Sequence, residues 1–368
     1  MPIIRVALDV PLSTLFDYEV SEKIRLEIGQ RVVVPFGRKQ VLGVAMEWAQ
    51  DSALAAERIK PVTRVLDDVP PLPPELLTLL RFTSEYYHHP LGMTVLAALP
   101  TRLRALEPVT IKQALDYTLS AAGRVLDLAT LPKRRVVQKR ILQALQNSPL
   151  NGAQLRSLSP SAPAALKALL EAGWVETCVP VARAGHCFEG AHALTEQQRQ
   201  AFEAVARQQG YGCFLLHGVT GSGKTEIYVH LMHEILQRGG QVLLLVPEIN
   251  LTPQLEHYFR SRFPDVEIAS LHSGLADGER MLNWIRAQSG EARIVIGTRL
   301  AVFTPMPKLS LVLVDEEHDP SFKQQDGLRY SARDVAIFRA RQRRVPLALG
   351  SATPSLESWH NAHSGLYR

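Results

Sequence analysis

An octapeptide at positions 218–225 carries the residue types that hold the phosphates of a nucleotide. Glycines there can adopt backbone angles that turn successive N–H groups toward phosphate oxygens. Lys224 can reach the β- and γ-phosphates, and the hydroxyl of Thr225 can ligate Mg²⁺. An apolar run precedes the octapeptide and an amphipathic stretch follows it, a context that favours a phosphate loop over a chance glycine turn. The candidate nucleotide contacts are Gly218, Val219, Thr220, Gly221, Ser222, Gly223, Lys224 and Thr225.

A pair of carboxylates, Asp315-Glu316, offers the second half of a hydrolytic site. Asp315 follows an apolar run and can hold Mg²⁺ through water, while Glu316 can orient and deprotonate an attacking water. The alternative is that acidic residues simply favour the positive end of a helix. Agreement with the octapeptide and with Gly350-Ser-Ala-Thr353 favours the hydrolytic interpretation. We therefore predict catalytic roles for Glu316, Asp315 and Lys224, and Mg²⁺ contacts for Thr225 and Asp315.

These motifs require a sheet that brings strand ends together. From about residue 192, apolar runs at 213–217, 242–246, 293–297, 311–315 and 347–350 alternate with helical segments. This alternation predicts a parallel sheet covered on both faces, whose ligands bind at the carboxyl ends of the strands. Two further motifs fall at predicted strand ends and offer hydroxyl, amide and guanidinium donors: Pro247–Gln254 and Gly297-Thr298-Arg299.

The first hundred residues favour a small β-rich domain, because short β-branched stretches recur between glycines. Phe16-Asp17-Tyr18 places an acidic residue between two aromatic rings, and cations follow the turn at Gly37. Aromatic rings can stack on bases while cations contact phosphates. However, Phe16 and Tyr18 share one face of a strand, and on the residues alone we favour core filling.

Residues 106–182 have the pattern of a winged helix-turn-helix, with three helical segments and a terminal hairpin. Such domains read DNA through the third helix. Here that helix is nearly uncharged from Pro163 onward, so a spacer or protein-docking role is at least as well supported.

A polar loop follows the carboxylates and combines Phe322 and Tyr330 with the cations Lys323, Arg329 and Arg333. This mixture suits base stacking with phosphate contacts. A charged, solvated loop is the alternative, and the residues alone do not decide between the two.

Composition agrees with a soluble multidomain protein. A chain of 368 residues suggests two or three domains, with 46% hydrophobic and 21% charged residues. The net charge of +5 leans only weakly toward a polyanionic partner. Cys178, Cys187 and Cys213 form no CxxC pair and are expected to be reduced thiols in a cytoplasmic protein. No apolar run is long enough to span a bilayer, so no membrane partner is expected.

The octapeptide, Asp315-Glu-Glu-His318 and Gly350-Ser-Ala-Thr353 together resemble the first motor lobe of a superfamily 2 helicase, a RecA-like P-loop lobe. Pro247–Gln254, Leu271–Gly274 and the loop from Lys323 to Tyr330 resemble, more narrowly, the family of bacterial primosomal helicases of replication restart. The resemblance covers the whole chain. It implies ATP and Mg²⁺ as cofactors, and forked DNA with a 3′ end and single-stranded DNA as partners. Primosome proteins and single-stranded DNA-binding protein are implied as further partners.

The resemblance also implies site residues. Phe16, Asp17, Tyr18, Gly37 and Lys60 correspond to the pocket for a DNA 3′ end, which now makes stacking outweigh core filling. Gln198, in Leu194–Gln198, corresponds to a glutamine that contacts adenine, and residues 321–333 to a DNA-sensing loop. The predicted DNA contacts are Phe16, Asp17, Tyr18, Gly37, Lys60, Thr298, Arg299, Phe322, Lys323, Arg329 and Tyr330.

The family resemblance predicts three domains: a 3′-end-binding domain at 1–105, a winged helix at 106–182 and a first motor lobe at 183–368. The family continues into a second motor lobe and cysteine-rich zinc motifs, whereas this chain stops at Arg368 and no residue here can be assigned to zinc. An N-terminal portion that binds forks and ATP, without rapid hydrolysis or unwinding, is therefore expected.

The function expected for the parent protein is that of an ATP-dependent 3′-to-5′ DNA helicase. It recognises stalled or D-loop forks and initiates primosome assembly. The main alternative is a non-catalytic fork-binding module with ATP as a ligand only. A P-loop kinase is a weaker alternative, because Asp315-Glu-Glu-His318 with Ser351-Ala-Thr353 is a combination typical of translocases.

Overall fold

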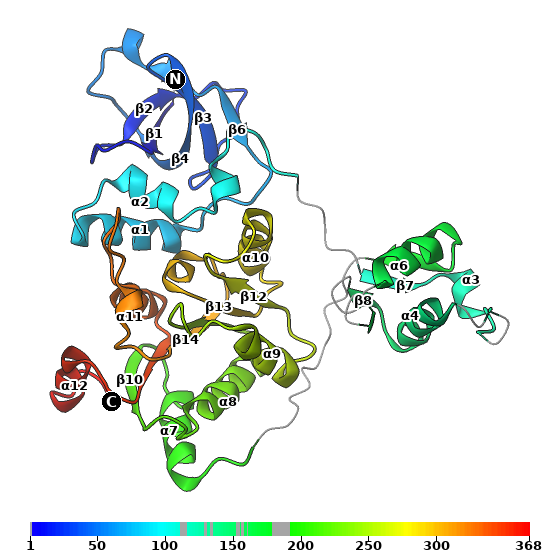
Figure 1. The fold of residues 1–368 in the computed structure, drawn as a ribbon. Helices are drawn as coiled ribbons and strands as arrows, with labels where there is room; N and C mark the ends of the chain where they lie inside the picture. Colours follow the sequence, from blue (N-terminus) through cyan, green and yellow to red (C-terminus); the bar gives the residue numbers. More distant parts are fainter. Residues whose placement is uncertain are drawn as a thin grey trace. The chain divides into compact units, whose positions relative to one another are not determined.

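The computed structural model describes residues 2–110, 116–128, 131–132, 135–151, 155, 158–159, 161–178 and 192–368 (Figure 1). Two compact units are present, one formed by residues 1–110 with 185–368 and the other by residues 111–184. Cys187 lies outside the described residues, as does most of the range 152–158, which the sequence predicts as the second of the three helical segments in 106–182. The secondary structure is mixed α/β, as predicted.

A six-stranded sheet, ordered β5-β2-β1-β4-β3-β6, forms the N-terminal part of the first unit. Alternation along β1 turns Ile4 and Val6 into the core and Arg5 away from it. Most neighbouring strands are antiparallel, and β2 runs parallel to β5. The strands are β1 (Ile3–Leu8), β2 (Phe16–Glu19), β3 (Arg31–Phe36), β4 (Lys39–Ala49), β5 (Lys60–Pro61) and β6 (Arg64–Leu66). Phe16 and Tyr18, which the sequence predicts to share one face of a strand, both lie on β2.

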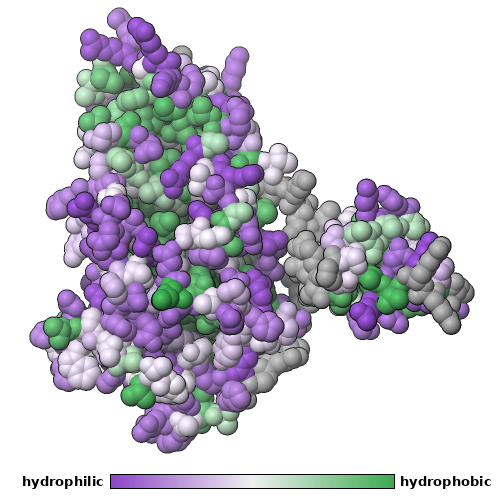
Figure 2. All heavy atoms as spheres, in the orientation of Figure 1, coloured by the Kyte–Doolittle hydropathy of each residue, from purple (hydrophilic) through white to green (hydrophobic). Residues whose placement is uncertain are grey.

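Two helices follow this sheet, α1 (Pro74–Tyr86) and α2 (Leu91–Ala97). Proline at the first position of α1 suits a helix start, because an N–H at that position would have no hydrogen-bond acceptor within the helix. The leucines of α1 are buried, and α1 also packs on α11 (Ala332–Arg343) from the C-terminal part of the same unit. Figure 2 shows hydrophobic residues gathered on the visible face over the N-terminal sheet, whereas the face over the second sheet is mostly hydrophilic.

The second sheet of this unit is wholly parallel, with the order β10-β15-β14-β11-β13-β12. Its strands are β10 (Gly212–His217), β11 (Gln241–Leu245), β12 (Ile268–Leu271), β13 (Ile294–Gly297), β14 (Leu309–Val314) and β15 (Pro346–Ser351). Five of these were predicted from apolar runs. The edge strand β12 was not, because its four residues, Ile-Ala-Ser-Leu, form no long apolar run.

Both faces of the parallel sheet are buried. Along β11, Val242 and Leu244 join one hydrophobic cluster, whereas Leu243 and Leu245 point to the opposite face and are equally buried. This pattern is typical of strands that are covered on both sides. The accompanying helices are α7 (Glu196–Ala206), α8 (Lys224–Gln237), α9 (Pro253–Arg262), α10 (Asp277–Ser289), α11 and α12 (Leu356–His363). The architecture fits the predicted motor lobe.

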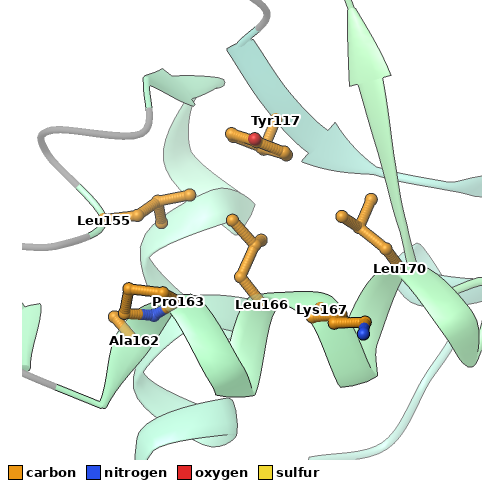
Figure 3. Close-up of a pocket in the computed structure, with 7 residues that line it drawn as sticks. All are labelled: Tyr117, Leu155, Ala162, Pro163, Leu166, Lys167 and Leu170. Atoms are coloured by element: carbon orange, nitrogen blue, oxygen red, sulfur yellow. The ribbon is translucent and has the colours of Figure 1, made fainter.

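The second unit contains a small antiparallel sheet, ordered β8-β7-β9. Its strands are β7 (Asp116–Leu119), β8 (Leu150–Asn151) and β9 (Val175–Cys178), and its described helices are α3 (Ala121–Arg124), α4 (Val136–Asn147) and α6 (Ala162–Glu171). Beside α6 lies a mainly apolar cavity of about 250 Å³ (Figure 3). It is lined by Tyr117, Leu155, Ala162, Pro163, Leu166, Lys167 and Leu170. The assignment of this unit as a winged helix stays a prediction.

Candidate nucleotide and DNA site

Three loops of the parallel sheet converge because they leave neighbouring strands in the same direction. Residues 218–223 follow β10, Asp315 follows β14, and Ser351 closes β15, which lies between those two strands. The carboxyl ends of parallel strands meet at one sheet edge, the usual ligand-binding edge of such folds. The topology therefore places the phosphate-loop motif and the carboxylate motif side by side.

The loop 218–223 has the backbone that its glycines make possible. Gly221 and Gly223 have φ values of +80° and +82°, in the left-handed region that side chains disfavour. A Cβ on Gly223 would also collide with Nε2 of Gln198. Gly223 is the N-cap of α8, so backbone N–H groups and the positive helix end face the loop.

Lys224 lies in this cradle. Its Nζ donates to the Gly218 carbonyl at 2.7 Å and lies 4.0 Å from Oε1 of Glu316. The hydroxyl of Ser222 is buried and has no hydrogen-bond partner in the described structure. A buried, unpaired donor beside an ammonium fits phosphate oxygens as ligands. Thr225 is half-buried in the first turn of α8, and Val219 and Thr220 are exposed on the loop.

Gln198 approaches the phosphate loop from α7. Its Nε2 donates to the Ser222 carbonyl at 2.8 Å, and its Oε1 accepts from the backbone N–H of Thr195 at 2.9 Å. The Thr195 hydroxyl in turn accepts from the N–H of Gln198, which completes a capping box. The glutamine thus joins the start of α7 to the phosphate loop, and its adenine contact stays a prediction.

Asp315 is half-buried and directly follows β14. Tyr228 donates its hydroxyl to Oδ1 of Asp315 at 3.0 Å, one turn after Lys224 on α8. Burial raises the pKa of the Asp315 carboxyl, and the neighbouring Glu316 carboxylate raises it further. Gly350 lies on β15, the strand between β10 and β14. A Cβ on Gly350 would collide with the Tyr228 hydroxyl, so β15 needs glycine at this position. The Mg²⁺ contacts of Asp315 and Thr225 stay a prediction, which their oxygen donors suit.

Glu316 is the second predicted carboxylate, and its side chain is half-buried. Its backbone has φ of 45°, an uncommon angle for a residue with a side chain. Its Oε2 lies 3.7 Å from Nδ1 of His318, and its Oε1 faces Lys224. A carboxylate that lies between the Lys224 ammonium and the His318 imidazole can orient and deprotonate a water.

The third carboxylate of the motif, Glu317, does something different. It is buried and accepts hydrogen bonds from Arg333 Nη1 at 3.0 Å, the Ser355 backbone N–H at 2.8 Å and the Ser358 hydroxyl at 2.9 Å. Glu317 therefore fastens the first turns of α11 and α12 to the motif. The sequence analysis assigned it no role, nor did it assign one to Tyr228. The position of Tyr228 one helical turn after Lys224 was the available signal.

The predicted 3′-end residues gather on and near β2. Phe16 packs edge-on against Phe36, and Tyr18 is buried in the sheet core with its hydroxyl donating to the Pro35 carbonyl at 3.1 Å. Tyr18 pairs with Lys60, whose Nζ donates to the Gly37 carbonyl at 3.3 Å.

The side chain of Asp17 points to the opposite face of β2 from Phe16 and Tyr18. It accepts from the Ser52 hydroxyl at 2.5 Å and lies 3.4 Å from Nε of Arg5. The structure thus brings together Phe16, Tyr18, Gly37 and Lys60, with Asp17 on the opposite face of the strand.

Near β14, the loop at 321–331 buries its aromatic residues. Phe322 is 3% exposed and Tyr330 is 1% exposed, whereas Lys323 and Arg329 are exposed. Tyr330 packs on Phe303 with ring centroids 5.0 Å apart. In this conformation the rings anchor the loop and the cations face solvent. Thr298 is buried, and Arg299 Nη1 donates to the Ser321 carbonyl at 3.1 Å, which joins these two predicted DNA segments.

Within the described part of the chain, no helix is both long and apolar enough to cross a membrane. Over the same residues, no group of three or more His, Cys, Asp or Glu side chains is arranged to hold a metal ion.

Comparison with known proteins defines the class. Residues 5–100 match the 3′DNA-binding domain (3′BD) family, and residues 195–362 match the DEAD/DEAH box helicase family. The two matched ranges coincide with the two sheets of the first unit. The chain therefore carries a 3′-DNA-binding domain and a helicase domain.

Similarity to individual proteins identifies a narrower family among DNA helicases. Replication restart protein PriA of Haemophilus influenzae is 39% identical over all of this chain and 51% of its own length. The PriA of Bacillus subtilis is 32% identical over 96% of this chain and 53% of its own length. The chain belongs to the PriA family of replication restart proteins, and it spans about half the length of these two relatives.

Proposed function

We propose that this chain binds a DNA 3′ end and ATP, and that it serves an ATP-dependent 3′-to-5′ DNA helicase of replication restart. The observation that carries the proposal is the convergence of Lys224, Asp315 and Glu316 at one sheet edge, with Lys224 Nζ 4.0 Å from Glu316. Support comes also from the matches to a 3′DNA-binding domain and a DEAD/DEAH box helicase.

Each residue of the nucleotide site has a role in this proposal. The N–H groups of residues 218–223 and the ammonium of Lys224 bind the phosphates. Mg²⁺, when bound, neutralises charge that develops on the phosphate oxygens. Thr225 and Asp315 fit the metal, and Tyr228 orients Asp315 through the 3.0 Å hydrogen bond. Glu316 accepts the proton of the attacking water, and Gln198 contacts the base of the nucleotide.

The DNA contacts form two groups. Phe16, Asp17, Tyr18, Gly37 and Lys60 receive the 3′ end, and the segment from Thr298 to Arg299 together with Lys323 and Arg329 tracks a strand near the motor. Phe322 and Tyr330 belong to the same proposed interface, where burial makes them anchors of the loop.

The remaining assignments complete the proposal. We assign 1–105 to the 3′-end domain, 106–182 to a winged helix that serves as a spacer or docks a protein, and 183–368 to the first motor lobe. Stalled or D-loop forks are the proposed DNA substrate. Primosome proteins and single-stranded DNA-binding protein are the proposed protein partners, in the cytoplasm.

ATP turnover with and without forked DNA tests the proposal. We expect hydrolysis by this chain to be slow but stimulated by DNA, and Glu316→Gln to lower the stimulated rate by about 10²- to 10⁴-fold, the usual contribution of a general base. The matched control is Glu357→Gln, at an exposed position on α12. A chain that binds forks and ATP but hydrolyses no ATP beyond the rate of Glu316→Gln supports the alternative, a non-catalytic fork-binding module.

A further inference from the structure

Tyr87 joins the N-terminal part of the first unit to the loop beside the carboxylate motif. It directly follows α1, and its hydroxyl oxygen accepts a hydrogen bond from the backbone N–H of Ser331 at 3.2 Å. The ammonium of Lys323 lies over the ring of Tyr87, 5.2 Å from its centroid. One side chain therefore contacts both ends of the loop 323–331.

The loop is closed at the same two positions. Lys323 and Ser331 form an antiparallel bridge, and Gln324 donates its backbone N–H to the Tyr330 carbonyl at 2.9 Å. Between these ends, Arg329 is exposed. Tyr87 thus contacts the two paired ends of this narrow loop, Lys323 and Ser331, which we call its neck. The cations of the loop face solvent.

A series of contacts runs from Ser331 toward the carboxylate motif. Ser331 is the N-cap of α11 and accepts from the N–H of Asp334. Two residues along, Arg333 donates to Glu317 at 3.0 Å, and Glu317 is the direct chain neighbour of Glu316. An unbroken series of contacts therefore runs from Tyr87 through the first turn of α11 to the carboxylate motif.

Elsewhere, α1 and α11 are packed firmly against each other. Glu75 of α1 pairs with the fully buried Arg339 of α11 at 3.0 Å. Phe82 and Phe338 stack with centroids 3.5 Å apart and planes at 3°. Because α1 and α11 are held together elsewhere, the Tyr87 hydroxyl is not required to join the two parts. Its partners, a loop amide and a loop cation, indicate a different task.

We propose that Tyr87 is a positioning residue, which fixes the neck of the loop 323–331 and thereby presents Lys323 and Arg329 to DNA. The inference rests on the proposed function, since it assumes that DNA contacts this loop. Burial raises the pKa of Tyr87 to about 12, so the phenol stays protonated and neutral at physiological pH. A neutral ring and hydroxyl keep their contacts with Lys323 and the Ser331 amide over that whole range.

Two matched substitutions test this role. Tyr87→Phe removes the hydroxyl and keeps the ring, whereas Tyr86→Phe removes a hydroxyl from the exposed neighbouring tyrosine. In Tyr87→Phe we expect the Ser331 amide to exchange hydrogen about 2- to 10-fold faster, the range for one lost hydrogen bond. The single-stranded DNA concentration for half-maximal binding is expected to rise by a similar factor. Tyr86→Phe is expected to match the wild type in both measurements.

Tyr87→Ala extends the test, because it also removes the ring beneath Lys323. Its half-maximal DNA concentration is expected to exceed that of Tyr87→Phe, and circular dichroism establishes that the variant is folded. Equal exchange or equal DNA binding in Tyr87→Phe and Tyr86→Phe overturns the proposal. Wild-type chain that hydrolyses no ATP in response to DNA contradicts the proposed ATPase instead, while exchange and DNA binding still decide the role of Tyr87.

Discussion

The imidazole of His318 lies 2.8 Å from the hydroxyl of Ser351, ring Nδ1 to Oγ. This contact joins the carboxylate motif after β14 to the loop after β15, and the other ring nitrogen lies 3.2 Å from the Thr353 hydroxyl. A shift of either loop therefore moves a group that lies 3.7 Å from Glu316. The two motifs, 33 positions apart in the chain, act as one structural unit.

Ser351→Ala tests this connection. The substitution removes the hydrogen bond to His318 and the one that the Ser351 hydroxyl accepts from the Thr353 N–H. Because this frees the ring beside Glu316, we expect DNA-stimulated ATP hydrolysis to fall about 2- to 10-fold. ATP affinity is expected to stay within about two-fold of wild type, because Ser351 contacts the phosphate loop through its backbone carbonyl, which accepts from the Gly218 N–H at 3.1 Å and which the substitution keeps. Steady-state hydrolysis and titration with a fluorescent ATP analogue measure the two quantities. Lower ATP affinity with an unchanged maximal rate contradicts the connection.

Lys224→Ala tests the phosphate cradle. The ammonium supplies charge-assisted hydrogen bonds, so its loss is expected to weaken ATP binding by about 10- to 100-fold. Binding to forked DNA should change little, because the proposed 3′-end pocket lies on the other sheet. The fluorescent ATP analogue measures the first effect and fork titration the second. Lys308→Ala, distant from the phosphate loop in the chain, is the control, and unchanged ATP affinity in Lys224→Ala refutes the assignment.

The chemistry of the DNA end tests Asp17. If this carboxylate accepts from a 3′-hydroxyl, a 3′-phosphate loses that hydrogen bond and meets a like charge. We expect forks with a 3′-phosphate to bind more weakly by about 1–3 kcal/mol. Asp17→Asn should remove most of this preference, since its amide carries no charge. Equal affinity of wild type for the two ends rules out the proposed contact.

Asp315→Asn tests how much the charge of the half-buried Asp315 carboxylate destabilises the fold. Its pKa lies above the ordinary value of 3.8, so the folded chain holds the proton more tightly than the unfolded chain. Stability from the protonated form is complete below the unfolded pKa and is lost as pH rises through the folded pKa. At neutral pH we expect Asp315→Asn to raise the free energy of unfolding by about 0.5–2 kcal/mol, the usual range for one stabilising substitution.

Thermal unfolding from pH 3 to pH 8 measures this effect. The stability difference between Asp315→Asn and wild type should grow as pH rises from the acid end, while Mg²⁺-dependent ATP binding is lost. Asp326→Asn, in the exposed loop, is the control. A constant difference across the pH range shows that the charge of Asp315 is not the cause.

Glu75→Ala tests the joint between α1 and α11. It leaves the fully buried guanidinium of Arg339 without its carboxylate, so we expect a loss of about 3–5 kcal/mol in the free energy of unfolding. The double variant Glu75→Ala with Arg339→Met removes the unpaired charge and should recover much of that loss. Urea denaturation measures all three chains. A loss below about 1 kcal/mol in the single variant indicates that the pair contributes little.

The sequence by itself predicted the residues of the nucleotide site. Glycine spacing around Lys224 and the carboxylates after an apolar run are local signals, because a phosphate loop and a strand end each need only neighbouring residues. The parallel sheet also followed from the alternation of apolar runs and helices. The short edge strand β12 escaped this reasoning, since four residues carry too little pattern to be told from a loop.

Tertiary structure decided how side chains are used. Residue types suggested that Phe322 and Tyr330 could stack on bases, yet both are buried and anchor the loop. Likewise, Glu317 and Tyr87 gave no local signal, because their partners lie far away along the chain at Arg333 and Ser331. Burial and long-range hydrogen bonds depend on which elements pack together. A motif can therefore specify what a residue is able to bind, whereas packing decides whether that side chain faces the ligand, the core or another loop.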